Sequence, residues 1–323
     1  MRKMSYFAVA AMLACGLAPA AARAQADWPA RPITMVVPFT PGGVSDNIAR
    51  PVAEAMGRAL GQTVVVENRG GAAGRIGIAH VAKSAPDGYT ILMSLPSISI
   101  LPETDKVMGR EPMFTLGQFR PIARITADTV VLAVRADSPW KTIGDYVAEA
   151  HKRDITYGSP GTYGALHIFM EAFKSAANLR LQHVPYAGAA PAVVDVLGGQ
   201  IESIIGSPAS VMQQVKAGRL RVLAHWGTGR IASLPDVPSL TEAGYPVSFA
   251  QWSGVFVPAA TPSAVVDKLR AAARFAAQDA KVRQAIEDVG ISVQYQDAAE
   301  FQAYWRDDTA KLAAAVQKIG KID

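Results

Sequence analysis

The amino-acid sequence predicts an α/β protein in which helices cover both faces of mostly parallel sheets. Apolar runs typical of strands alternate with helical patterns along the chain after residue 24. The early runs "ITMVVP" and "TVVVEN" are continuously apolar, which is typical of parallel strands buried on both faces. Glycines recur where a strand gives way to a helix. The 323 residues, half of them hydrophobic, suffice for one large or two medium domains.

The expected elements follow from this alternation in chain order. Apolar runs predict strands at 33–38, 62–67, 89–94, 129–135, 154–158, 181–185, 202–206, 220–226 and 252–257. Helical patterns lie between and after them, at 45–60, 74–84, 142–151, 163–177, 189–198, 209–217, 263–277, 280–289 and 298–318. No internal repeat or low-complexity tract interrupts the series.

The first 24 residues, "MRKMSYFAVAAMLACGLAPAAARA", have the order of a secretory signal. Two basic residues precede an apolar run, which ends in small residues and the A-x-A sequence Ala22-Arg23-Ala24. A membrane anchor and a lipoprotein modified at Cys15 are weaker alternatives. Cys15 is the single cysteine, so we expect an exported product that starts near Gln25 and has no disulfide.

Loss of this segment changes the charge of the chain. It holds three basic and no acidic residues, so 32 minus 3 leaves 29 basic residues against 27 acidic ones. The remaining chain is nearly neutral and has no Lys/Arg cluster that could follow a phosphate backbone. Nucleic acid is therefore excluded as an expected partner.

Motifs for catalysis, nucleotides and metals are absent. The sequence contains no G-x-x-x-x-G-K-[ST], G-x-G-x-x-G, G-x-S-x-G or H-E-x-x-H pattern, and its five histidines are widely separated. Ser45 and Asp46, at a predicted helix start, are better interpreted as caps than as nucleophile and base. We expect no enzyme activity, no cofactor and no metal.

Four glycine-rich loops are the candidate binding elements. They lie at 39–46, 68–75, 158–164 and 186–190, each between a predicted strand and a helix. In open α/β sheets such loops are at the carboxyl ends of strands, where ligands bind. Helix N-termini there present unpaired N–H groups and partial positive charge, which suit an anion.

Collinear motifs covering essentially the whole mature chain resemble the substrate-binding receptors of tripartite tricarboxylate transporters, the Bug receptors. The motifs are "WPARPITMVVPFTPGGVSDNIAR", "LGQTVVVENRGGAAGRIGIAHVAKSAPDGYTILM", "HVPYAGAAPAVVDVLGGQIE", "LPDVPSLTEAGYP" and "VPAATP". The resemblance implies a periplasmic binding protein of the type II, two-lobed Venus-flytrap kind, with the ligand between the lobes. It implies a non-enzymatic monomer that hands a carboxylate to membrane permease subunits. A ligand-presenting component for a signalling protein is the alternative.

By analogy with that family, lobe 1 comprises residues 25–127 and 248–323, and lobe 2 comprises 128–247, with two strands crossing the hinge. The candidate substrate-binding residues are Phe39, Thr40, Gly42, Gly43, Asp46, Ser94, Ser159, Thr162, Tyr163, Gly164, His167, Tyr186, Gly188 and Ala189.

Several of these positions have a second interpretation. Asp46 either stabilises its own helix N-terminus, which we favour, or accepts a hydrogen bond from the ligand. His167 is better interpreted as a packing residue than as a cleft residue, and Ser94 could be an ordinary strand-end polar residue. Gly206 and Arg75 depart from the family pattern, where an acidic residue and an asparagine are usual. Arg75 is interpreted as a solvated loop residue in preference to a countercharge for a second carboxylate.

The first prediction concerns processing. Export should remove the first 24 residues, so N-terminal sequencing of the exported protein should begin near Gln25. Recovery of the chain in a membrane fraction with Met1 retained would contradict both the signal interpretation and the receptor interpretation.

Overall fold

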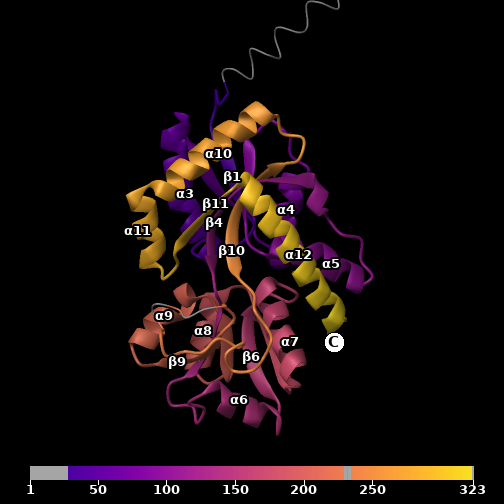
Figure 1. Cartoon of the computed structure of the whole chain (residues 1–323), viewed down its shortest axis with the longest axis vertical. Coiled ribbons are helices and arrows are strands. Elements are labelled where there is room, and N and C mark those ends of the chain that lie inside the picture. Colours follow the sequence, from indigo (N-terminus) through magenta and orange to yellow (C-terminus); the bar gives the residue numbers. More distant parts are fainter. Residues whose placement is uncertain (1–27, 229–230, 232–233, 322–323) are drawn as a thin grey trace, which may run out of the picture.

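The computed structural model describes residues 28–228, 231 and 234–321. The predicted signal segment, including Cys15, lies outside the described residues. Two α/β bodies lie one above the other, each built around its own sheet (Figure 1). We call the body with the six-stranded sheet lobe 1 and the body with the five-stranded sheet lobe 2.

Lobe 1 contains a sheet in the order β11-β4-β10-β3-β1-β2. β1 pairs in parallel with β2 and β3, whereas β10 pairs antiparallel with β3 and β4, and β11 antiparallel with β4. The strands are β1 (Ile33–Val37), β2 (Val64–Asn68), β3 (Thr90–Ser94), β4 (Phe119–Asp128), β10 (Gln251–Pro258) and β11 (Val293–Asp297).

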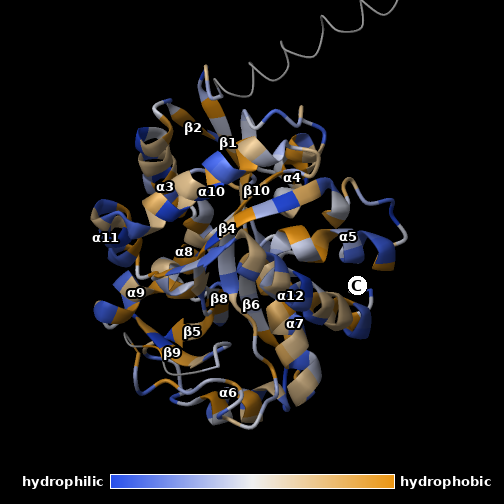
Figure 2. Cartoon of the chain, turned by 45° about the horizontal axis from the view of Figure 1, so that its top comes forward, coloured by the Kyte–Doolittle hydropathy of each residue, from blue (hydrophilic) through white to orange (hydrophobic). Residues whose placement is uncertain are grey.

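Helices cover both faces of this sheet, as continuously apolar strands require. One core cluster joins Met35 of β1 to residues of α3, α10 and α11, and another joins the adjacent Val36 to residues of α4, α5 and α12. In Figure 2, α11 is largely in the blue of hydrophilic residues, whereas α10 shows both hydrophilic and hydrophobic residues. The helices are α3 (Val44–Leu60), α4 (Arg75–Ala82), α5 (Ser97–Val107), α10 (Ser263–Gln278), α11 (Ala280–Asp288) and α12 (Ala298–Ile319), with short 3₁₀ turns η1 (Ala72–Gly74) and η2 (Leu116–Gln118).

Lobe 2 contains a sheet in the order β7-β6-β8-β5-β9. β6 pairs in parallel with β7 and β8, and β5 pairs antiparallel with β8 and β9. Its strands are β5 (Val131–Arg135), β6 (Ile155–Pro160), β7 (Leu181–Tyr186), β8 (Ser203–Gly206) and β9 (Leu220–His225), and its helices are α6 (Ile143–Ala150), α7 (Ala165–Ala177), α8 (Ala189–Leu197) and α9 (Pro208–Lys216).

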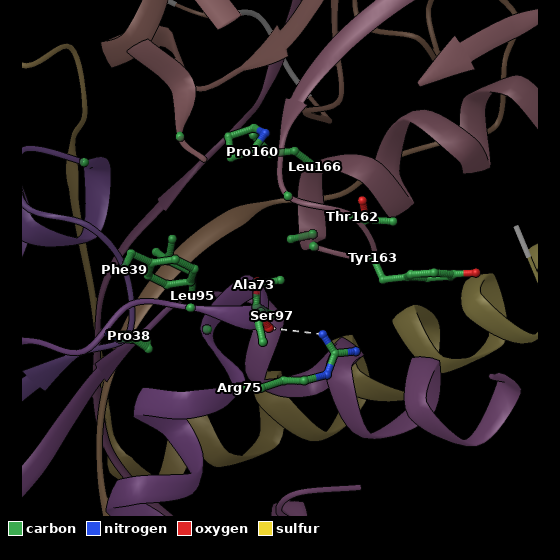
Figure 3. Close-up of a pocket in the computed structure, with 18 of the residues that line it drawn as sticks. Pro38, Phe39, Ala73, Arg75, Leu95, Ser97, Pro160, Thr162, Tyr163 and Leu166 are labelled. Atoms are coloured by element: carbon green, nitrogen blue, oxygen red, sulfur yellow. Dashed lines mark hydrogen bonds between the residues drawn. The ribbon is translucent and has the colours of Figure 1, made fainter. Parts of the chain in front are cut away.

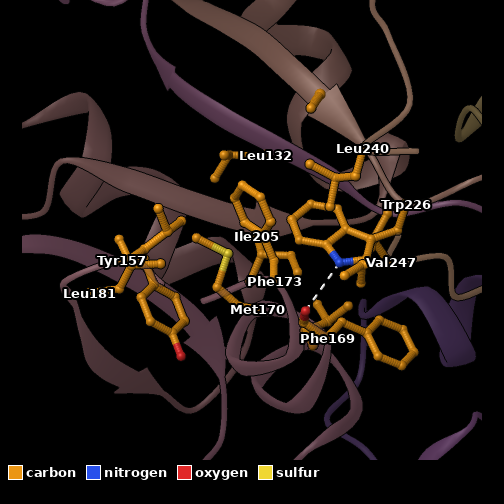
Figure 4. Close-up of a cluster of buried hydrophobic side chains, with 14 of the residues drawn as sticks. Leu132, Tyr157, Phe169, Met170, Phe173, Leu181, Ile205, Trp226, Leu240 and Val247 are labelled. Atoms are coloured by element: carbon orange, nitrogen blue, oxygen red, sulfur yellow. Dashed lines mark hydrogen bonds between the residues drawn. The ribbon is translucent and has the colours of Figure 1, made fainter. Parts of the chain in front are cut away.

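The largest fully buried side chain of the lobe 2 core is Trp226. Its indole nitrogen donates to the Phe169 carbonyl oxygen at 3.1 Å (Figure 4). Leu240 and Val247, from the segment that returns towards lobe 1, belong to the same cluster. The return segment is therefore part of the lobe 2 core.

The predicted fold class is confirmed, with one difference: both sheets are mixed instead of mostly parallel. The chain leaves lobe 1 through β4 and returns through β10, and two neighbouring strands that carry the chain in opposite directions must pair antiparallel. Apart from the short 3₁₀ turns, three elements were not predicted. α5 contains Pro102, β4 contains Pro121 beside a register shift, and β11 is the polar edge strand "VQYQD", so each lacks the usual pattern.

The helix α12 packs on both lobes. Phe301 and Trp305, near its start, belong to a lobe 1 cluster, whereas Leu312 and Val316 belong to the lobe 2 core cluster. Trp305 also donates to Ser99 of α5 at 2.8 Å. Among the described residues, no helix combines the length and apolar character that crossing a membrane would need.

The second prediction tests this packing. Leu312 is fully buried, so Leu312→Ala should lower the free energy of unfolding by about 2–5 kcal/mol through lost burial and a residual cavity. Lys318→Ala, at an exposed position on the same helix, is the control and should change it by less than about 0.5 kcal/mol. Urea denaturation of both variants measures the effect, and equal stabilities would mean that α12 does not hold the lobes together.

Candidate functional site

A cavity of about 890 Å³ lies between the two lobes. Its walls include parts of all four glycine-rich loops, together with residues of α5 and the segment that follows it. Figure 3 shows Phe39, Ala73 and Arg75 from lobe 1 facing Pro160 and Thr162 from lobe 2. The loops that the sequence indicated separately are thus brought together at one site.

Helix N-termini from both lobes open onto this cavity. The first residues or N-caps of α3, α4, α5, α7, α8 and α9 line it, and none of these helices has a side-chain hydrogen bond at its N-cap. Of the four described helices that begin elsewhere, α6, α11 and α12 are capped by Thr142, Asp279 and Asp297, whereas α10 is not capped. The helix starts at the cavity therefore keep N–H groups available for a ligand.

Charged side chains at the cavity balance one another. Two arginines, Arg75 and Arg110, and two carboxylates, Asp105 and Glu111, line it. Arg75 and Arg110 both pair with Asp105, at 2.9 Å and 3.2 Å. A ligand anion would therefore meet little net side-chain charge, and backbone N–H groups would provide most of the attraction.

The preferred interpretation of Arg75 as a solvated loop residue is wrong. Arg75 is the first residue of α4, and its side chain is only 10% exposed. Its guanidinium donates to Asp105 and to the Thr104 hydroxyl, the latter at 2.8 Å. Sequence reasoning missed this because the partners lie on α5, the helix that its internal proline concealed.

The two lobes approach each other closely at two points of the cavity lining. A Cβ placed on Gly161 would lie 3.6 Å from the Ala73 Cβ, and one placed on Gly188 would lie 3.7 Å from the Thr40 hydroxyl oxygen. Of the four described non-glycine residues with positive φ, three line the cavity: Ala72, Ala73 and Tyr163. Strained backbone of this kind concentrates at functional sites.

Asp46 holds the first loop together from behind the cavity wall. Its carboxylate accepts from the Gly42 N–H and from the Arg50 and Asn68 side chains, all at 2.9 Å. Burial raises the pKa of Asp46, but these bonds outweigh burial and lower the pKa below its ordinary value. Asp46 is buried and does not line the cavity, so its negative charge is neutralised away from any ligand.

A pair of stacked histidines supports the loop of lobe 2. The Tyr163 N–H donates to His167 Nδ1 at 2.8 Å, and the His167 ring stacks on His183 at a centroid distance of 3.8 Å. His183 in turn is 2.8 Å from the Ser159 hydroxyl. Burial, then His183 and Lys174, lower the pKa of His167 to about 3. The His167 ring is therefore neutral, and its unprotonated Nδ1 can accept the Tyr163 N–H.

The predicted site residues divide into two groups. Nine line the cavity: Phe39, Thr40, Gly43, Thr162, Tyr163, Gly164, Tyr186, Gly188 and Ala189. Five do not line it: Asp46, Ser94, Ser159 and His167 are buried behind the wall, and Gly42 is exposed outside the cavity. The Tyr186 hydroxyl donates to Asp195 at 2.7 Å, so that proton is not available to a ligand.

Other lining residues were not predicted, because no local pattern distinguishes them. They include Ser45, Leu95, Ser97, Asp105, Ser207 and Gln251. Ser45 had been interpreted as a cap, but its hydroxyl makes no hydrogen bond. The described residues contain no group of three His, Cys, Asp or Glu side chains arranged to hold a metal ion.

Comparison with known proteins identifies one family that matches most of the chain. Residues 48–321 match the family described as the tripartite tricarboxylate transporter family receptor. The chain is 33% identical to the Cupriavidus necator UPF0065 protein in the gbd 5' region, over 96% of this chain and 94% of the relative. It is 31% identical to BugT of Bordetella pertussis, over 91% of this chain and 90% of BugT.

Several solved structures resemble this chain over about nine tenths of its length. A structure described as a periplasmic transporter has a TM-score of 0.82 and 37% identity, covering 90% of this chain and 98% of that one. An R. palustris protein solved with adipate has a TM-score of 0.81 and 28% identity, with coverage of 91% and 99%. MatC from Rhodopseudomonas palustris, solved with bound malate, has a TM-score of 0.80 and 25% identity, with coverage of 89% and 99%.

The third prediction concerns the buried His167. An unfolded histidine takes up a proton near pH 6.5, whereas His167 stays neutral down to about 3, so acid favours the unfolded chain. This single residue should make the free energy of unfolding fall by about 2 kcal/mol between pH 7 and pH 5. In His167→Asn, which keeps an acceptor for the Tyr163 N–H, the fall should be smaller by that amount.

The measurement is urea denaturation of both proteins at each pH. Comparing the variant with the wild-type chain cancels the titrating groups that His167 does not contact, and the same comparison in a His183→Asn background removes the contribution of the stacked partner. An equally steep fall in the two proteins would mean that His167 is already protonated in the folded state.

Proposed function

Because the chain belongs to the tripartite tricarboxylate transporter receptor family, a family of periplasmic, non-enzymatic solute receptors, we propose that it binds a small organic carboxylate between its lobes. It then delivers this ligand to the membrane permease subunits of such a transporter. The proposal places the chain in the periplasm after removal of residues 1–24. It assigns residues 25–127 and 248–323 to lobe 1 and 128–247 to lobe 2.

The observation that carries this proposal is the set of uncapped helix N-termini at the cavity. Each offers N–H groups and a partial positive charge of roughly half a unit, which favour an anion. Gly43, Gly164 and Gly188 occupy three of the N-cap positions, so no side chain prevents a carboxylate from approaching the backbone.

Relatives support the class of ligand. The R. palustris protein was solved with adipate and MatC with malate, and both ligands are dicarboxylates. A second carboxylate needs a further cationic or N–H-bearing region. Arg110, whose side chain is 55% exposed, and the N-termini of α4 and α5 provide one on the lobe 1 side of the cavity.

The fourth prediction is a ligand screen by thermal unfolding. At about 100 times its dissociation constant, a carboxylate that binds the folded chain alone should add roughly 2.7 kcal/mol to the free energy of unfolding. The panel comprises dicarboxylates, tricarboxylates, aromatic carboxylates and acidic amino acids, with neutral sugars and cationic amino acids as negative controls. If the stabilising compounds lack an anionic group, or are consumed, the proposed function is wrong.

A variant of the first loop links such a hit to the cavity. Gly43 has φ of −77°, which valine can adopt, so Gly43→Val adds bulk at the cavity wall without left-handed strain. It should abolish most of the stabilisation by the ligand while the free protein remains folded. Gly117→Val is the control, because Gly117 is exposed, does not line the cavity and has open space around its Cβ position.

A further inference from the structure

Large apolar side chains from both lobes line the cavity. Its volume of about 890 Å³ lies in the upper part of the range of about 300–1,000 Å³ that pockets for drug-sized ligands span. The apolar lining includes Phe39, Leu95, Met113, Pro160 and Leu166. A small acid such as succinate would leave much of this space to water in contact with apolar walls, which is unfavourable. The cavity therefore fits a ligand with an apolar body better than a small polar acid.

Many polar side chains of the lining already have partners or are buried. Arg75 and Asp105 pair with each other at 2.9 Å, and the Tyr186 hydroxyl donates to Asp195 at 2.7 Å. Three further lining residues have a side-chain hydroxyl or amide oxygen that is buried from solvent: Ser45, Ser207 and Gln251. Hydroxyl groups along a ligand would therefore find few side-chain partners here, and losing their water would be costly.

The half-buried Phe39 ring lies beside a helix start. A Cβ on Gly74, the N-cap of α4, would be 3.3 Å from the tip of that ring, so the ring packs against the backbone of this turn. The next residue, Thr40, faces the N-cap of α8, because its hydroxyl oxygen would be 3.7 Å from a Cβ on Gly188. A carboxylate bound at these helix starts would therefore place the adjoining part of the ligand against the Phe39 ring.

Leu95 and two residues of lobe 2 extend this apolar surface. β1 and β3 are neighbouring parallel strands, and Phe39 and Leu95 follow their carboxyl ends, so both residues lie at the same edge of the sheet. In Figure 3 the Phe39 ring lies near Leu95 and faces Pro160 of lobe 2. Leu166, in the first turn of α7, lines the same cavity. An apolar ligand body would thus contact both lobes at once.

Met113 adds an exposed apolar side chain to the cavity lining. It is 46% exposed and belongs to the segment that follows α5. The methionine side chain adapts its shape to irregular apolar partners. A ligand that fills the cavity would cover this side chain, which water contacts in the free protein.

We propose that this receptor selects carboxylates with a large apolar body, an aromatic ring or an extended aliphatic chain, over small or hydroxylated acids. This inference rests on the proposed function, in which helix N-termini bind the carboxylate. The apolar body lies between Phe39 and Leu95 on one side and Pro160 and Leu166 on the other. Its burial supplies affinity without further charged or hydroxylated partners.

The test compares charge-matched acids by isothermal titration calorimetry on the mature protein. One pair is propionate and phenylpropionate, and one series is succinate, adipate and suberate, with malate as its hydroxylated member. Burial of a methylene strengthens binding about fourfold, so each step of two methylenes should tighten binding about tenfold. Phenylpropionate should likewise bind about tenfold or more tightly than propionate, and malate should bind no more tightly than succinate.

Two variants and a control connect this preference to the lining. Phe39→Ala should lower the preference for phenylpropionate and for suberate by about fivefold or more. Met113→Gln changes an exposed side chain, so it keeps the fold, and it should lower the preference for suberate over succinate. The matched control is Phe275→Ala, because Phe275 is 46% exposed on α10 and does not line the cavity. It should leave both preferences as they are, and thermal unfolding of each ligand-free variant checks the fold.

Three outcomes would overturn the inference. Affinity could be independent of apolar size in both comparisons, or malate could bind more tightly than succinate and adipate. A folded Phe39→Ala variant could also lose affinity equally for small and large acids, which would mean that the ring shapes its loop without contacting the ligand body. All three leave carboxylate binding itself intact, whereas failure of every carboxylate to bind would contradict the proposed function instead.

Discussion

The rest of the site depends on one constraint: the backbone N–H groups at the uncapped helix starts need hydrogen-bond partners. A backbone N–H that faces a cavity must find a partner, and here the chain supplies none through its N-cap side chains. The residues around these helix starts leave the N–H groups accessible to a ligand. Four of the caps are glycines, which keep the backbone accessible, and the carboxylate of Asp46 in the first turn of α3 is held behind the wall by Arg50 and Asn68. Even Asp105, within the cavity, is neutralised by two arginines.

Local strain and packing keep the lobe 2 loop in this arrangement. Tyr163 adopts φ of +58°, unusual for a bulky residue. Its N–H is held by His167, and its hydroxyl contacts the Met108 sulfur of the segment after α5 at 2.8 Å. In Figure 3 its ring points away from Phe39, so the residue contributes mainly backbone to the cavity. The same side chain therefore links the loop to a contact between the lobes.

The sequence predicted the parts of this molecule that depend on local pattern. Glycines at strand-to-helix turns indicated Gly43, Gly164 and Gly188, because a small residue and an adjacent helix start are visible in the sequence itself. Asp105 and Gln251 could not be identified in this way, since their positions depend on contacts between distant segments. Ser207 was hidden for another reason. A serine before a helix indicates a cap, and only the three-dimensional arrangement shows that its hydroxyl makes no capping bond.

The position of α12 affects how the whole chain unfolds. This helix begins on the sheet of lobe 1 and ends in the core of lobe 2. Leu312 and Val316 are therefore buried only while both lobes are folded, so the stability of each lobe depends on the other. Unfolding either lobe exposes apolar surface that belongs to its neighbour. The two bodies in Figure 1 are therefore not separate folding units, and heating should melt them in one calorimetric transition.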